Sequence, residues 1–85
     1  MTLPVSSFED AVVRETSRPF RLWDSVRKKN VPYRYYGSAR RALDGALLIV
    51  RWEQVGRTLE VYNALTGQWL GTYKRGVNSI QFTKE

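Results

Sequence analysis

Hydrophobic residues recur at helical spacing in the first third of the chain. Residues 6–9 (Ser-Ser-Phe-Glu) match a capping box, in which the Ser and Glu side chains satisfy free N–H groups at a helix start. Farther on, Phe20, Trp23 and Val26 recur at every third position, which indicates one face of a second helix. We therefore expect residues 1–32 to form two short helices.

The period of the pattern changes in residues 33–85, which we expect to be rich in β-strands. The run at 46–52 is apolar at successive positions and includes β-branched residues, which predicts a buried central strand. Residues 63–67 have the composition of a hairpin loop, with Gly67 in the left-handed conformation. The other elements that we expect are strands at 33–36, 58–62, 68–73 and 79–83 and a short helix or turn at 37–44.

These elements predict a single α+β domain spanning residues 1–85. Its fold would be two short N-terminal helices packed on a three- to four-stranded antiparallel sheet or a small SH3-like barrel. So small a sheet needs cover to be stable, and we expect both Trp23 and Trp69 to be largely buried. The expected core packs Phe8, Val12, Phe20 and Trp23 against Leu48, Val50, Leu59, Val61 or Leu70.

The residue types present exclude several classes of chemistry. The chain has neither Cys nor His, which rules out disulfides, thiol catalysis and a zinc site built on those ligands. No Gly-rich phosphate loop or carboxylate cluster is present, so we expect no cofactor, no metal and no catalytic residues. The N-terminus lacks the features of a secretory signal and no apolar run could span a membrane, so we expect a cytoplasmic protein without membrane contact.

Positive charge is concentrated in the middle of the chain. The net charge is +6, and residues 14–41 hold nine basic residues against two acidic ones. Tyrosines at 33, 35 and 36 interleave with this charge, a mixture that suits phosphate contacts and base stacking. The residues that we predict to bind nucleic acid are Arg27, Lys28, Lys29, Arg34, Tyr36, Arg40 and Arg41.

The extended segment 33–36 makes a prediction about which rings face outward. Side chains alternate along an extended chain, so Tyr33 and Tyr35 would share one face and Arg34 and Tyr36 the other. Burial of an unpaired Arg34 would be costly. We therefore expect Tyr33 and Tyr35 to face inward and Tyr36 to face outward as a stacking surface.

Residues 46–75 carry a pattern of hairpins and aromatic positions. Its three parts are Leu-Ile-Val-Arg-Trp at 48–52, Leu-Glu-Val-Tyr-Asn at 59–63 and Thr-Gly-Gln-Trp-Leu-Gly-Thr at 66–72. This pattern resembles the small β-barrel near the C-terminus of bacteriophage Mu-type transposases and related integrases, although Glu53-Gln54 replaces the Asp-Pro of that family. The resemblance implies a barrel that contacts DNA or protein without catalysis.

The sequence thus predicts a small, basic, non-catalytic domain of bacterial, phage or plasmid origin that binds nucleic acid, DNA more readily than RNA. Two alternatives stay open. One is a protein-interaction module whose basic face meets an acidic protein. The other is a ribonuclease toxin of a toxin–antitoxin pair, which is similar in size and charge and would have to work without His.

Overall fold

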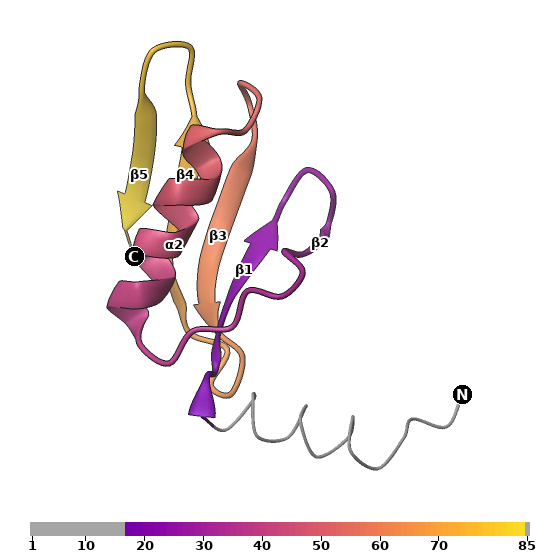
Figure 1. Ribbon diagram of the computed structural model, residues 1–85, viewed down its shortest axis with the longest axis vertical. Coiled ribbons are helices and arrows are strands. Elements are labelled where there is room, and N and C mark those ends of the chain that lie inside the picture. The colour runs from indigo at the N-terminus through magenta and orange to yellow at the C-terminus, as the bar shows by residue number, and fades with distance from the viewer. Residues whose placement is uncertain (1–16, 85) are drawn as a thin grey trace, which may run out of the picture.

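A computed structural model describes residues 17–84 as an α+β fold (Figure 1). One helix, α2 (Ala39–Arg51), lies across one face of a five-stranded antiparallel sheet with strand order β2-β1-β3-β4-β5. The expected helix near residues 6–16 falls outside the described residues. Within 17–84, no helix combines the length and hydrophobicity needed to cross a bilayer. The strands are β1 (Phe20–Asp24), β2 (Lys29–Asn30), β3 (Thr58–Asn63), β4 (Trp69–Arg75) and β5 (Ile80–Lys84).

The predicted second helix is wrong, because its first half is strand β1. β1 pairs with β3 along its whole length, with Leu22 opposite Val61. This ladder satisfies the backbone hydrogen-bonding groups of β1 and places alternate side chains on opposite faces of the sheet. The three-residue spacing of Phe20 and Trp23 therefore does not indicate a helix. Asp24 then ends the strand, since its carboxylate accepts hydrogen bonds from two backbone N–H groups of the following turn, at 3.0 Å each.

The predicted central strand at 46–52 is also wrong, because residues 46–51 form the second half of α2. The helix begins at Ser38, whose Oγ accepts a hydrogen bond from the Arg41 N–H at 3.2 Å. Ala42, Ala46 and Val50 recur every fourth residue and are the helix residues buried against the sheet. A short apolar run fits a buried strand and a helix equally well, and the cap at Ser38 decides between them.

The core lies between α2 and the sheet. Leu22, Ala42, Ala46 and Val61 form its fully buried centre, and Phe20 and Leu70 pack around them as expected. Leu59 and Val50 are buried as well. Two expected core residues lie elsewhere: Leu48 is 57% exposed on α2, and Trp23 lies on the face of the sheet that α2 does not cover.

The hairpin between β3 and β4 confirms the sequence prediction. Gly67 has a φ of +77°, and its N–H donates to the carbonyl of Asn63 at 2.7 Å. A β-bulge shifts the register beyond Val61, so that Tyr62 pairs with Trp69 while Val61 pairs with Gly71. The extra residue, Leu70, therefore packs toward the core, and Trp69 joins Tyr62 on the opposite face.

The predicted facing of the tyrosine segment is wrong. Tyr33 has a φ of +61° and is 88% exposed, so regular alternation starts only after it. Tyr36 exchanges two backbone hydrogen bonds of 3.1 Å with Phe20, which turns its ring toward the core under α2. Tyr35 faces the other way, with its ring 4.5 Å from the guanidinium carbon of Arg21.

The contact between Tyr36 and Gly45 of α2 generates the first prediction. A Cβ on residue 45 would lie 2.5 Å from Cζ and 2.7 Å from Cε1 of the Tyr36 ring. Gly45→Ala should lower the free energy of unfolding by about 1–3 kcal/mol through overpacking. This loss should outweigh the gain in helix propensity, which is about 1 kcal/mol.

Urea unfolding of the parent, Gly45→Ala, Tyr36→Ala and the double variant would measure this effect. Once the Tyr36 ring is removed, Gly45→Ala should become neutral or stabilising. A stabilising effect of Gly45→Ala in the parent would contradict the contact.

Candidate functional site

A groove beside α2 gathers three of the predicted nucleic-acid-binding residues. Arg34, Tyr36 and Arg41 line the same hollow of about 480 Å³, between α2 and the segment that leads into it. Neither Arg34 nor Arg41 forms an ion pair with a carboxylate of residues 17–84. The other lining residues are Asp44, Gly45, Leu48 and Ile49. We call this hollow the α2 groove; it is basic toward the N-terminal end of the helix and apolar farther along.

The first turn of α2 adds to the positive potential of the groove. The free N–H groups at the start of a helix carry partial positive charge, and acidic side chains usually offset it. The first turn of α2 contains no acidic residue and instead carries Arg40 and Arg41. Arg40 has only a long, exposed ion pair with Asp44, at 3.9 Å. This end of the helix is therefore electrostatically suited to an anion.

The other predicted basic residues lie on the β1–β2 hairpin. Lys28 and Lys29 are exposed there and pair with no carboxylate among the described residues. Arg27 differs, because its guanidinium reaches Asp24 at 3.4 Å and Glu53 at 3.7 Å. Arg57 also contacts Glu53, at 3.8 Å. Arg27 thus helps to hold the hairpin against the end of α2, a role that the sequence did not suggest.

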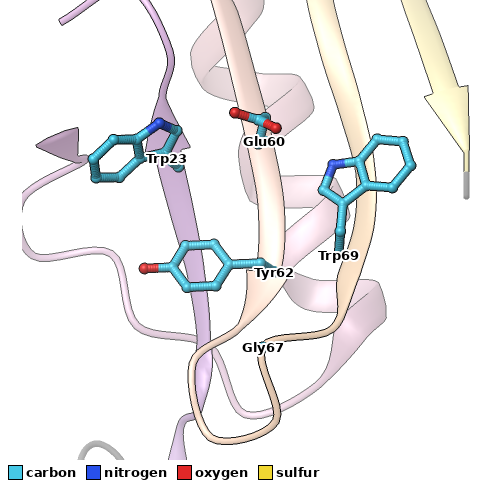
Figure 2. A pocket seen from close by; sticks show the side chains of 5 residues that line it. All are labelled: Trp23, Glu60, Tyr62, Gly67 and Trp69. Carbon is cyan, nitrogen blue, oxygen red and sulfur yellow. The ribbon is translucent and has the colours of Figure 1, made fainter. Parts of the chain in front are cut away.

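A second hollow lies on the opposite face of the sheet. Trp23, Tyr62 and Trp69 come from three adjacent strands and surround Glu60, with α2 behind the sheet (Figure 2). With the backbone of Gly67 they line a pocket of about 310 Å³, which we call the aromatic pocket. Because both tryptophans were expected to be largely buried in the core, the sequence did not predict this pocket. The alternation along residues 58–62, with Leu59 and Val61 inward, was the available signal that Glu60 and Tyr62 face outward.

Hydrogen bonds fix the polar atoms of this pocket. The Tyr62 hydroxyl donates to Asn30 Oδ1 at 2.8 Å, and Trp69 Nε1 donates to Thr72 Oγ1 at 3.0 Å. The Ser25 hydroxyl donates to one carboxylate oxygen of Glu60, at 2.8 Å. These bonds hold the Tyr62 and Trp69 rings in defined positions on the open face of the sheet.

A third hollow, of about 240 Å³, separates the end of α2 from the β4–β5 turn. Arg51 and Arg75 both line it. One terminal nitrogen of Arg75 donates to the Gly76 carbonyl at 2.8 Å, whereas its buried Nε has no partner in the described part of the chain. Across residues 17–84, no three acidic side chains gather as a metal site would require.

Comparison of the chain with protein-family models, curated proteins and solved structures finds no match. The resemblance of residues 46–75 to Mu-type transposases and integrases therefore stays a prediction. Part of its pattern, residues 48–51, lies in helix α2 rather than in a strand.

Burial changes the titration of two tyrosines near α2. Desolvation raises the pKa of Tyr36, and the nearby Arg34 charge partly offsets this by favouring the phenolate. Desolvation also raises the pKa of Tyr73, and the negative charge of Asp44 adds to the increase. Both rings border the core beneath α2, so folding favours the neutral phenol over the charged phenolate.

These shifts predict a loss of stability at high pH. An unfolded tyrosine ionises at a pKa of about 10, whereas folded Tyr36 and Tyr73 keep their protons to higher pH. The folded state then binds more protons, so the free energy of unfolding falls as pH rises above about 10. Urea titrations between pH 8 and 11 should show a shallower fall for Tyr73→Phe than for the parent, and Tyr33→Phe is the exposed-ring control. Parallel profiles for the parent and Tyr73→Phe would contradict the prediction.

Proposed function

We propose that this domain binds nucleic acid through the basic side chains along residues 28–41. The observation that carries the proposal is the meeting of Arg34 and Arg41 in the α2 groove, with no ion pair to a carboxylate in the described residues. Phosphate groups are the natural partners of such unpaired guanidinium groups, which bind them through two parallel hydrogen bonds. DNA is the first ligand to test, because residues 46–75 resemble a family that acts on DNA.

The residues that would hold phosphates form a basic strip, which we define as Lys28, Lys29, Arg34, Arg40 and Arg41. The backbone that carries these residues runs from the β1–β2 hairpin to the start of α2 (Figure 1). A phosphate at the first turn of α2 would relieve the repulsion between Arg40, Arg41 and the helix dipole. Arg27 is left out because it pairs with Asp24 and Glu53.

The proposed stacking residue changes from Tyr36 to Tyr33. The Tyr36 ring packs against the core and the backbone of Gly45, so only part of it borders the α2 groove. Tyr33 is 88% exposed and directly precedes Arg34. A base stacked on Tyr33 would bring its phosphates close to Arg34.

A protein-interaction module is the second candidate, favoured by apolar exposure on α2. Leu48 and Trp52 are one helical turn apart and are 57% and 89% exposed. Contiguous exposed apolar residues of this kind are typical of protein-binding surfaces. A partner that covered them and also contacted the basic strip would be an acidic protein with an apolar patch.

Salt dependence tests the nucleic-acid proposal directly. Five phosphate contacts predict that the logarithm of the affinity for duplex DNA falls with the logarithm of salt at a slope of about −4 to −5. The double variant Arg34→Gln/Arg41→Gln should reduce the magnitude of this slope by about two. Fluorescence anisotropy at several salt concentrations would measure both slopes.

The matched control is Lys74→Gln, which removes an exposed charge from the sheet face opposite α2. Its slope should stay close to that of the parent. Equal effects of Lys74 and of the strip residues, or no binding at low salt, would overturn the proposal. Equal affinity for poly-glutamate would favour the acidic-protein alternative.

The revised stacking residue gives a separate prediction. Tyr33→Ala should weaken binding of a single-stranded oligonucleotide by about 1–3 kcal/mol, which is the usual contribution of one stacked base. Its melting temperature should match that of the parent, because the ring is exposed. Tyr36→Ala should instead lower the melting temperature. Thermal melts and anisotropy titrations would separate the two roles, and unchanged affinity of Tyr33→Ala would exclude Tyr33 as the stacking residue.

A further inference from the structure

Glu60 is unusual among the carboxylates in residues 17–84. Asp24, Asp44 and Glu53 each lie within 4 Å of an arginine side chain, whereas Glu60 has no basic partner within that distance. Its hydrogen bond comes from the neutral Ser25 hydroxyl and reaches only one of its two oxygens. In a chain with a net charge of +6, a carboxylate that pairs with no cation is available to an external one.

The surroundings of Glu60 consist mainly of aromatic rings. Trp23 pairs with Glu60 across β1 and β3, and Tyr62 pairs with Trp69 across β3 and β4. The three rings surround the carboxylate on the open face of the sheet (Figure 2). The polar atoms of Tyr62 and Trp69 bond to Asn30 and Thr72, so the surfaces left for a ligand are mainly ring carbons and the Glu60 carboxylate.

This combination selects for positive charge. The face of an aromatic ring carries partial negative charge and attracts a cation placed within about 6 Å, most strongly when the ring is Trp. A carboxylate beside the rings adds a full negative charge. A phosphate would be repelled by both groups, so the aromatic pocket and the basic strip suit ligands of opposite charge.

We propose that the aromatic pocket binds an alkylammonium group, with a quaternary trimethylammonium as its best ligand. Methyl groups spread the positive charge over an apolar surface that fits against rings and needs no hydrogen-bond acceptors of its own. The volume of about 310 Å³ is at the lower end of small-molecule sites, which suits such a head group with part of its chain. Free choline and a trimethylated lysine side chain both present this group.

The test compares choline with 3,3-dimethylbutan-1-ol, which has the same shape without the charge. Isothermal titration calorimetry on the full chain should give saturable binding of choline and at least fivefold weaker binding of the alcohol. A short peptide with trimethyllysine, titrated beside its unmodified form, separates a protein-borne group from a free one. Preference for the peptide or for choline identifies the source.

Matched variants locate the binding. Glu60→Gln should weaken choline binding about fivefold or more, and Trp69→Phe, which keeps a ring, should also weaken it. Trp52→Phe alters an exposed tryptophan outside the pocket and should change nothing. Thermal melts of each variant report whether the fold is intact.

Several results would overturn the assignment. Equal affinity for choline and the neutral alcohol, or unchanged binding by Glu60→Gln and Trp69→Phe, would show that charge and rings do not act together. The assignment would also be overturned if choline did not bind while an oligosaccharide or a nucleobase did. DNA affinity of Glu60→Gln should equal that of the parent, so this test fails or succeeds independently of the basic strip.

Discussion

The close approach of Tyr36 to α2 is the constraint on which much of this structure depends. Residue 45 has no side chain, so the tyrosine ring can lie directly against the helix backbone. Because Tyr36 is also hydrogen-bonded to Phe20 at the start of β1, the ring links the helix to the sheet. Tyr36 and Gly45 also line the α2 groove, together with Arg34 and Arg41. The residues that join the helix to the sheet thus border the hollow that holds these two arginines.

The two faces of the sheet differ in electrostatic character. On the face covered by α2, the groove brings together arginines that have no ion pairs within the described residues. On the open face, Glu60 lies among aromatic rings without a cationic partner. A single sheet separates the two environments, because consecutive side chains of a strand point to opposite faces of the sheet. β1 and β3 each contribute alternate residues to the core and to the aromatic pocket.

Part of this fold could be predicted from the sequence and part could not, for physical reasons. The hairpin at 63–67 and its flanking strands follow from local chemistry, since Gly67 permits the required backbone conformation and alternation identifies the strands. Residues 20–24 and 46–51 were assigned to the wrong elements. The first forms a strand only because β3 pairs with it, and the apolar run of the second satisfies two periodicities at once.

The sequence likewise pointed to one of the two candidate sites and not to the other. The residues of the proposed basic strip all lie within residues 28–41, so the charge distribution along the sequence points to them, and the ion pairs of Arg27 separate that residue from its neighbours. The aromatic pocket draws single residues from β1, β3 and β4, so its members never stand together in the sequence. Its tryptophans were assigned to the core because a large apolar residue is most often buried. Only the pairing of the strands places Trp23 beside Glu60.

The β-bulge at Val61 and Tyr62 has a consequence for how this chain tolerates insertions and deletions. A regular strand running back from Gly71 would put Trp69 under the helix and Leu70 on the open face, whereas the extra residue reverses both. One extra residue thus decides which side chains of β4 face the helix. Deleting Leu70 would leave Trp69 opposite Tyr62 in a regular strand, so the aromatic pocket would keep its ring while the core would lose a side chain.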